Sequence, residues 1–211
     1  MNPDTAMKIE AFGVMVVQGY GVTECSPLVA VGRNKFHDRD TVGVLLPSYE
    51  MKTEHGEIFL RGPSIMKGYY KDAEANAAAL TDGWFRTGDI GERNPNGLLT
   101  ITGRLKNLIV LKNGKKLSPE MAEGLIERIP LVREVRVYGA PCGDTEDDVL
   151  PAAAIYPDPE QTAGLENFEI LSMIQESIGK INNVLPSYQQ IQIVTLRDQP
   201  FERTRSGKIR R

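Results

Sequence analysis

Five short segments place glycine, charged and hydroxyl residues together where strands are predicted to end, and each could contact a nucleotide. The first follows an apolar run and contains Gly19, Tyr20, Gly21, Thr23 and Glu24. Its glycines let the backbone approach a ligand closely, and the Tyr20 ring offers a surface on which a base could stack. The Glu24 carboxylate could hold a hard cation that bridges phosphates. A simple strand-terminating turn explains the same residues, because a Gly-x-Gly pair alone is weak evidence for a site.

Three further segments carry charged residues in or beside glycine turns. They are residues 56–62 with 66–70, residues 82–89, and residues 103–106. An aspartate in a glycine turn, such as Asp89, can accept hydrogen bonds from the vicinal hydroxyls of a ribose. Arg104 could reach a phosphate or a ribose, and Lys106 follows it in a predicted linker. Taken alone, these segments are as well explained by hairpin turns and solvated linker cations.

The fifth segment, residues 201–208, brings a glycine and Lys208 together near the end of the sequence. It is not a Walker motif, because Ser206 precedes the Gly-Lys pair instead of following it. A lysine beside a flexible glycine could still deliver a mobile cation to a reacting phosphate. The alternative is a solvated basic tail over residues 203–211, which is what such a run usually means.

The composition limits the classes of function. The 211 residues are 41% hydrophobic and 25% charged, with a net charge of -3, so the protein is globular and has no general attraction for nucleic acid or anionic lipid. Cys25 and Cys142 lack zinc-site spacing and favour buried thiols in a reducing compartment. The only histidines, His37 and His55, argue against a histidine-dependent triad or metal site. With no apolar run near the ~18 residues of a membrane span and no signal peptide, we expect a cytoplasmic protein.

The first half of the sequence predicts mainly strands and turns. Residues 3–12 predict a short helix that begins at Pro3 and ends at Gly13, and a second helix is expected over residues 73–80. Strands are expected at residues 14–17, 41–45, 57–61 and 98–102. This half is therefore predicted to be a β-rich, barrel-like unit.

The pattern changes after Gly103. The apolar run at residues 108–111 is followed by Asn113 and Gly114 and then by Lys115, Lys116 and Leu117, an order that predicts a hairpin. Ser118 is expected to cap a helix that begins at Pro119. The apolar face of that helix is predicted to contain Met121, Ala122, Leu125, Ile126 and Ile129. A second helix is predicted to bury Phe168, Leu171, Ile174, Ile178 and Ile181, and strands are expected at residues 135–138, 152–156 and 191–194. The order indicates an α+β domain whose helices cover one face of a small sheet.

Taken in order, the five segments resemble the signatures of the AMP-forming acyl-adenylate ligases, the superfamily of acyl-CoA synthetases, adenylation domains and luciferases. The similar stretches are QGYGVTE at 18–24, GEIFLRG with MKGYY, DGWFRTGD at 82–89, GRLKNLIVLKNGKKLSPEMAE at 103–123 and RSGKIRR at 205–211. The stretch KNLIVLKNGKKLSPE, residues 106–120, further resembles the long-chain fatty-acid synthetase branch of this superfamily. The resemblance implies an α+β fold in which residues 1–102 are the β-rich, barrel-like end of the nucleotide-binding N-terminal domain. It makes residues 103–107 a hinge and residues 108–211 a mobile α+β lid.

The same resemblance implies a two-step reaction that uses ATP, Mg²⁺ and coenzyme A. A fatty acid or other carboxylic acid attacks the α-phosphate of ATP, which gives acyl-AMP and pyrophosphate, and the thiol of coenzyme A then displaces AMP. The nucleotide-binding residues that it implies are Gly19, Tyr20, Gly21, Asp89 and Arg104. Among them, Tyr20 would flank the adenine, Asp89 would hold the ribose hydroxyls and Arg104 would contact the ribose-phosphate.

Further roles follow from the resemblance alone. Thr23 and Glu24 would meet the phosphate and Mg²⁺, and Lys208 would neutralise the charge that grows in the first step. Lys106 takes the hinge position. Rotation about that hinge would withdraw Lys208 and bring the Asn113-Gly114 turn to the pantetheine channel.

The resemblance does not extend to a whole enzyme of this family. The Ser/Thr/Gly-rich loop that grips the β- and γ-phosphates, and most of the acyl tunnel, precede these signatures in the family and are absent from the 211 residues. Val110 stands where luciferase-like members place a second lysine, so that role is not assigned. We therefore expect an excised piece that is inactive without the missing N-terminal part of the same enzyme.

Three alternatives stay open at this point. The chain could belong to an adenylation domain that loads a carrier protein, or it could be a short paralogue that acts as a non-catalytic binding module. A nucleic-acid module built on the arginine-rich tail is disfavoured by the net charge of -3. No transmembrane segment is expected, while peripheral membrane contact through a lipid substrate remains open.

Overall fold

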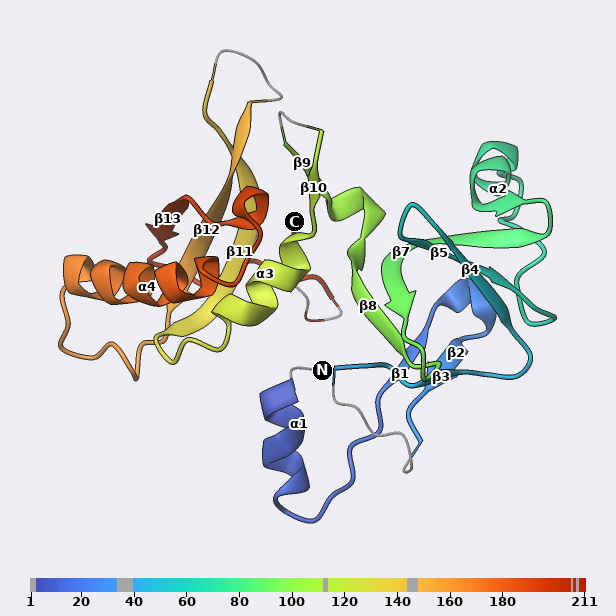
Figure 1. Cartoon of the computed structure of the whole chain (residues 1–211), viewed down its shortest axis with the longest axis horizontal. Helices are drawn as coiled ribbons and strands as arrows, with labels where there is room; N and C mark the ends of the chain where they lie inside the picture. Colours follow the sequence, from blue (N-terminus) through green and yellow to red (C-terminus); the bar gives the residue numbers. More distant parts are fainter. Residues whose placement is uncertain (1–2, 34–39, 112–113, 144–147, 206, 208) are drawn as a thin grey trace. The chain divides into compact units, whose positions relative to one another are not determined.

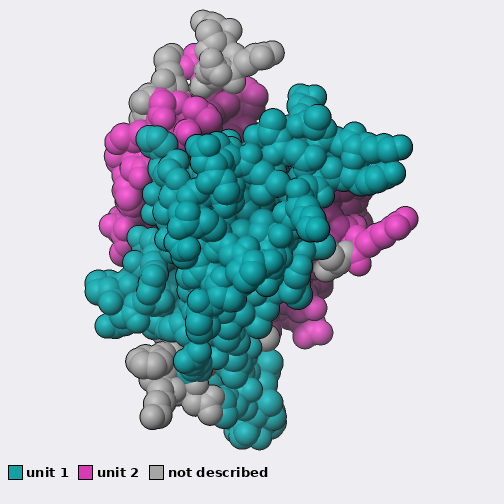
Figure 2. Space-filling view, turned by 90° about the vertical axis from the view of Figure 1, so that its right-hand side faces the viewer, with its two compact units in different colours: residues 1–106 teal, residues 107–211 magenta. Residues whose placement is uncertain are grey.

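The protein was analysed as a computed structural model that describes residues 3–33, 40–111, 114–143, 148–205, 207 and 209–211. The chain forms two compact units, Met1–Lys106 and Asn107–Arg211, which are coloured separately in Figure 2. The division lies within the segment 103–107, where the character of the sequence changes. No helix of the described part of the chain is long and apolar enough to cross a membrane.

The first unit begins with α1 (Pro3–Glu10), which ends close to Gly13 as predicted. The strand predicted at residues 14–17 is wrong, because the first described strand is β1 (Gly19–Gly21). Val14, Met15 and Val17 are 57%, 58% and 48% exposed. An apolar run becomes a strand only when another strand pairs with it, and the described residues provide none here.

Two antiparallel sheets build the rest of this unit (Figure 1). One has the order β1-β2-β3 and contains β2 (Leu28–Val31) and β3 (Val44–Leu45). The other has the order β4-β5-β7-β6, with β8 also paired to β7. Its strands are β4 (Glu50–Glu54), β5 (Glu57–Arg61), β6 (Leu80–Thr81), β7 (Trp84–Arg93) and β8 (Leu99–Arg104). The helix α2 (Ala73–Ala79) lies between β5 and β6, as predicted.

The strand predicted at residues 41–45 is shortened to β3 because Gly43 bends the backbone into the left-handed region, with φ of +89°. The bend also joins the two sheets. The Val42 N–H donates to the Leu99 carbonyl at 2.8 Å, and the Leu99 N–H donates to the Gly43 carbonyl at 2.8 Å. The core beneath the sheets includes Ile58, Leu60, Val29, Phe85 and Leu99.

Two-residue turns connect the tightest hairpins of this unit. His55 and Gly56, between β4 and β5, have φ of 51° and 83°, and Asp82 and Gly83, between β6 and β7, have φ of 51° and 78°. Positive φ at both central residues is the type I′ geometry that matches the twist of paired strands. The Asp82-Gly83 turn is therefore a structural element that sets the register of β7.

The second unit is an α+β domain, as predicted. It contains the hairpin β9 (Ile109–Val110) and β10 (Lys116–Leu117), and a sheet of order β11-β12-β13. The sheet strands are β11 (Val132–Pro141), β12 (Val149–Pro157) and β13 (Ile193–Leu196). Because β12 and β13 are parallel, they need a crossover, and α4 (Asn167–Asn182) supplies it. The helices α3 (Pro119–Ile126) and α4 cover one face of the sheet (Figure 1).

Two residues of the predicted helix faces and one predicted cap are wrong. Met121 is 45% exposed and Phe168 is 71% exposed. On α4 the burial predicted for Ile174 and Ile178 is confirmed, and Ile170 joins them; the three recur every four residues and therefore share a face. Ser118 does not cap α3 through its side chain.

One of the two cysteines departs from the prediction of buried thiols. Cys25 is fully buried, but Cys142 is exposed, at the end of β11. Its thiol donates to the Asp148 carbonyl at 3.2 Å.

Candidate functional site

Asp89 is the centre of a buried polar cluster in the first unit. The residue lies on β7 and is 2% exposed. The Tyr20 hydroxyl donates to its Oδ2 at 2.7 Å, and the Arg104 Nε lies 2.8 Å from its Oδ1. The β7–β8 register sets Asp89 opposite Arg104. Three residues predicted to contact one nucleotide, from three separate segments, are thus brought together.

Tyr20 is held in this cluster as a hydrogen-bond donor. Its side chain is buried on β1, and both burial and the hydrogen bond to Asp89 raise the pKa of the phenol. The hydroxyl therefore keeps its proton over the physiological range and continues to donate to the carboxylate. The cluster combines one neutral and one cationic donor on a single anion, which offsets the cost of burying the charge.

Glu57 supports the turn that precedes Asp89, and sequence reasoning missed it. It is 6% exposed at the start of β5, and its Oε2 accepts a hydrogen bond from an Arg86 terminal nitrogen at 2.8 Å. Its Oε1 accepts the Gly88 N–H at 3.3 Å. The Thr87 hydroxyl completes the turn, because it donates to the Ile58 carbonyl at 2.8 Å and accepts the Asp89 N–H at 3.0 Å. The sequence signal that could have indicated Glu57 is an acidic residue at the start of a strand whose next three residues are apolar.

Glu24 lies in a 3-10 turn at Thr23–Cys25, and contacts with the segment 66–70 hold it there. The Tyr69 hydroxyl donates to the Glu24 Oε1 at 3.0 Å, and the Met66 N–H donates to the Glu24 carbonyl at 2.7 Å. On α2, Asn76 accepts the Tyr69 N–H at 2.5 Å and donates to the Tyr69 carbonyl at 3.0 Å. The helix thereby positions the tyrosine that orients Glu24.

At this turn Glu24 offers a single carboxylate to a cation. Within the described residues, no group of three or more His, Cys, Asp or Glu side chains could hold a metal ion. Mg²⁺ commonly uses one or two carboxylates together with substrate phosphates. Thr23 is exposed beside Glu24, so both side chains can face a ligand from the same turn.

Gly21 is required by close packing. A Cβ at this position would lie 1.8 Å from the Pro27 carbonyl oxygen, which no side chain can tolerate. Gly19, the other glycine of the segment, is exposed at the start of β1. The predicted close approach at Gly21 is thus to the protein's own backbone.

The predicted hinge and hairpin residues are described in part. Lys106 is exposed in a 3-10 turn, Leu105–Asn107. Gly114 has φ of +73°, as the predicted hairpin turn requires, and the Leu111 N–H donates to the Lys115 carbonyl at 2.9 Å. Asn113 and Lys208 lie outside the described residues.

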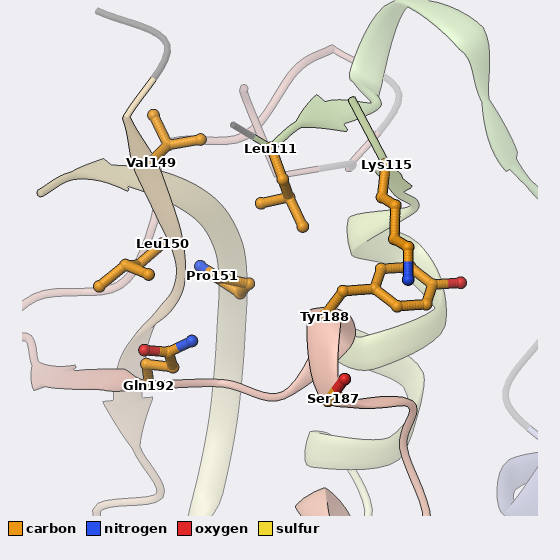
Figure 3. Close-up of a pocket in the computed structure, with 8 residues that line it drawn as sticks. All are labelled: Leu111, Lys115, Val149, Leu150, Pro151, Ser187, Tyr188 and Gln192. Carbon is orange, nitrogen blue, oxygen red and sulfur yellow. The ribbon is translucent and has the colours of Figure 1, made fainter. Parts of the chain in front are cut away.

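A pocket of about 480 Å³ opens beside this hairpin within the second unit (Figure 3). Its lining residues are Leu111, Lys115, Val149, Leu150, Pro151, Ser187, Tyr188 and Gln192. The Lys115 Nζ lies 4.5 Å from the centroid of the Tyr188 ring. Sequence reasoning missed the pocket because its walls come from segments more than 70 residues apart, which only the sheet brings together.

Comparison with known families finds matches to both units. The family model described as AMP-binding enzyme matches residues 1–70, and that described as AMP-binding enzyme C-terminal domain matches residues 106–211. Long-chain-fatty-acid–CoA ligase FadD15 of Mycobacterium bovis is 37% identical over 60% of this chain and 21% of its own length. Long-chain-fatty-acid–CoA ligase 1 of Schizosaccharomyces pombe is 36% identical over 75% of this chain and 25% of its own. Indoleacetate–CoA ligase of Aromatoleum aromaticum is 31% identical over 94% of this chain and 39% of its own.

Solved structures show the same similarity. The o-succinylbenzoate CoA synthetase (MenE) of Bacillus subtilis, in complex with the acyl-adenylate intermediate OSB-AMP, has a TM-score of 0.79 and 25% identity. The match covers 99% of this chain and 42% of that chain. The chain thus spans well under half the length of the relatives named here. The C-terminal-domain model alone matches half of the chain, and the relatives and solved structures are of the same kind. The chain therefore belongs to the AMP-binding enzymes, the family of acyl-adenylate-forming ligases.

Proposed function

We propose that the chain is the C-terminal part of a fatty-acid–CoA ligase, which activates a carboxylic acid as acyl-AMP and transfers the acyl group to coenzyme A. The observation that carries the proposal is the cluster in which Tyr20 and Arg104 hold the buried Asp89 carboxylate. The long-chain ligases among the relatives support the fatty-acid specificity.

Asp89 would accept the hydroxyls of the ribose. Its carboxylate is already oriented by two donors, so little conformational entropy remains to be lost when a nucleotide binds. A guanidinium has five N–H donors, and the Arg104 side chain is 46% exposed. Arg104 can therefore hold Asp89 through Nε and also contact the ribose-phosphate. The Tyr20 ring would flank the adenine, with Gly19 and Gly21 shaping the backbone on either side.

Thr23 and Glu24 would meet the phosphates. When bound, Mg²⁺ would neutralise the phosphate charge and polarise the oxygens at the reacting centre. Glu24 would hold that ion, and Tyr69 would keep the carboxylate in place through its hydroxyl. The exposed Thr23 hydroxyl would add a hydrogen bond to a phosphate oxygen.

Lys208 would stabilise the charge that develops between the carboxylate and the α-phosphate. After adenylation, rotation at Lys106 would withdraw it and bring Asn113 and Gly114 to the channel that admits coenzyme A. The pocket beside the hairpin supports a ligand-facing role for this edge of the second unit.

The test uses the parent ligase, by which we mean a longer polypeptide that carries these residues behind a phosphate-binding loop. We expect acid-dependent ATP–pyrophosphate exchange, with a long-chain fatty acid preferred over indoleacetate, and acyl-CoA as the final product. Acyl transfer to a carrier protein in place of coenzyme A would indicate the carrier-loading alternative. Absence of exchange with every acid, in a folded parent, would indicate a non-catalytic module.

A variant of the same parent separates the two steps. Lys208→Ala should abolish adenylation and spare thioester formation from supplied acyl-AMP, because the lysine acts only where the α-phosphate is attacked. Equal loss of both steps would contradict the role proposed for Lys208.

A further inference from the structure

Strand β7 carries a bulge that ends at Asp89. The β5–β7 ladder pairs Phe59 with Arg86 and then Glu57 with Ile90, with a shift of register between these two pairs. The three residues of β7 that end at Asp89 therefore stand opposite a single residue of β5. A bulge beside a site commonly redirects a side chain. Here the side chain concerned is the carboxylate at the centre of the proposed nucleotide contact.

Two side chains bind the backbone groups that the bulge removes from the ladder. The Glu57 Oε1 accepts the Gly88 N–H at 3.3 Å. The Thr87 hydroxyl donates to the Ile58 carbonyl at 2.8 Å and accepts the Asp89 N–H at 3.0 Å. Gly88 has φ of +67°, a conformation that favours glycine. Because buried backbone groups need partners, these contacts stabilise one conformation of the bulge.

Glu57 is itself held in place. Its side chain is buried, and it begins β5 directly after the type I′ turn that joins β4 to β5. Its Oε2 accepts a hydrogen bond from Arg86 at 2.8 Å, and the Arg86 guanidinium carbon lies 5.6 Å from the centroid of the Phe59 ring. Rotation of the Glu57 side chain would break a charge-assisted hydrogen bond, so its position is transmitted to the Gly88 backbone.

From this geometry we propose that Glu57 and Thr87 are positioning residues, which hold the bulge so that the Asp89 carboxylate is oriented toward the two hydroxyls of the ribose. The inference rests on the proposed function, because Asp89 must bind the ribose. Neither Glu57 nor Thr87 is assigned a contact with the nucleotide, since both act through the backbone of the bulge. Loss of either should therefore weaken recognition of the ribose and leave the other substrates unaffected.

The first experiment is Glu57→Met in the parent ligase. We expect the KM for ATP in ATP–pyrophosphate exchange to rise by at least about fivefold, because a displacement of ~1 Å in a positioned group can cost about a hundredfold. The kcat and the KM for the fatty acid should stay within about twofold, since a contact that is equal in the ground state and the transition state affects only the KM of its own substrate. Glu57→Gln should give a smaller rise, because its amide oxygen can still accept one of the two hydrogen bonds.

The analogue 2′,3′-dideoxy-ATP, which lacks both ribose hydroxyls, separates a positioning role from a general structural one. The unmodified parent should prefer ATP to the analogue, and Glu57→Met should reduce that preference by at least about fivefold, the same loss as in the KM for ATP. A general structural defect would raise the KM for both nucleotides and leave the preference unchanged. An unchanged preference would overturn the proposal.

Two substitutions of Thr87 test the other half of the arrangement. Thr87→Val removes the hydroxyl with little change in shape and should also raise the KM for ATP, whereas Thr87→Ser keeps the hydroxyl and should restore it. In an Asp89→Asn parent, Glu57→Met should add little to the KM for ATP, because both substitutions act on one contact. Fully additive effects would overturn the proposal.

The matched control is Glu54→Met, which removes the carboxylate opposite Glu57 in the β4–β5 ladder. Glu54 pairs with Lys52 at 2.6 Å and its side chain is 51% exposed, so we expect unchanged kinetics. If the unmodified parent lacks exchange, or if Asp89→Asn leaves the KM for ATP unchanged, the proposed function fails. If Asp89→Asn raises that KM and Glu57→Met does not, this inference alone fails.

A second measurement needs only the 211-residue chain. In Glu57→Met, amide hydrogen exchange at Gly88 and Asp89 should become faster, while exchange in β2 of the same unit should not change. Unchanged exchange at Gly88 and Asp89 would show that Glu57 does not hold the bulge. Faster exchange throughout the first unit would show a general structural role and would also overturn the proposal.

Discussion

At the scale of single residues, the proposed nucleotide contact centres on Asp89. Its side chain is almost completely buried and accepts from two donors, Tyr20 and Arg104. Glu57 fixes the Gly88 backbone immediately before it. The Tyr20 hydroxyl and the Arg104 Nε each engage one oxygen of this carboxylate, so a bound ribose would share the carboxylate with these two donors. The cluster depends on long-range contacts, since Tyr20 and Asp89 are 69 positions apart.

We expect Asp89→Asn in the parent ligase to raise the KM for ATP by about tenfold or more, because a hydrogen bond to a charged group contributes about 1.5–3 kcal/mol. The amide keeps the shape of the side chain but loses the charge that pairs with Arg104. Steady-state kinetics at varied ATP checks the prediction. Glu50→Gln, which breaks the exposed pair with Arg61, is the control and should leave KM unchanged. Equal values for the two variants would exclude Asp89 from the site.

Cys25 gives a prediction on pH dependence. Burial, with a contribution from Glu24, raises the pKa of its thiol from 9.0 to about 11. Above pH 9 the unfolded chain therefore loses this proton before the folded chain does, so the stability of the first unit should fall as pH rises from 9 toward 11.

Unfolding in urea at several pH values, followed by the fluorescence of the single tryptophan, Trp84, measures this slope. Cys25→Ala should be less stable throughout but should show a shallower decline above pH 9. An unchanged slope would mean that Cys25 does not titrate as proposed. Alkylation offers a second check, because the exposed Cys142 should react and the buried Cys25 should not.

At the scale of elements, the turn after β1 is set by packing between backbones. The Cβ that Gly21→Ala introduces would meet the Pro27 carbonyl at 1.8 Å, so β1 or the following 3-10 turn must shift. We expect a destabilisation of at least about 1–3 kcal/mol, the usual cost of overpacking. Because Glu24 lies in that turn, the site should be disturbed as well.

Gly124→Ala is the matched control for this substitution. Gly124 lies inside α3, where an added Cβ would meet nothing within 4 Å. Alanine there should stabilise the second unit by about 0.5–1 kcal/mol through helix propensity. Urea unfolding compares the two variants. Trp84 fluorescence follows the first unit, and circular dichroism follows the second. Destabilisation by both variants would contradict the packing argument.

At the scale of the whole molecule, the chain consists of two units of nearly equal length, each with its own core. The first carries the cluster around Asp89, and the second carries the pocket beside the β9–β10 hairpin. The proposed reaction needs both, together with a loop that binds the β- and γ-phosphates.

We expect the 211-residue chain alone to show no acid-dependent ATP–pyrophosphate exchange, since no segment of it resembles that phosphate-binding loop. Addition of a polypeptide that supplies the loop should restore exchange if the two pieces associate. Circular dichroism of the isolated chain provides the control for folding. Exchange by the purified chain alone would refute the expectation.

Local signals in the sequence were sufficient for several elements. Strand β5 has the bounds predicted for it, α2 ends one residue early, and the hairpin around Gly114 forms where its turn residues require it. Alternation, helix caps and turn glycines act over a few residues, so the sequence itself expresses them. The order of the five signatures is likewise a property of the sequence alone, and the family that it indicates is confirmed.

Only the tertiary structure decided which residues meet. It leaves Val14 and Met15 exposed and outside the strands of the described residues, turns Phe168 away from the core, and adds Glu57 and Asn76 to the site. Glu57 enters the site through the pairing of β5 with β7, whereas Asn76 contacts Tyr69 only seven positions away. For the paired strands, a one-residue change in register would reverse which side chains are buried. The sequence by itself determined the kinds of residue available for nucleotide chemistry. Long-range contacts determined which of them share a site, because strand pairing sets Arg104 opposite Asp89 and a side-chain hydrogen bond between the two sheets adds Tyr20.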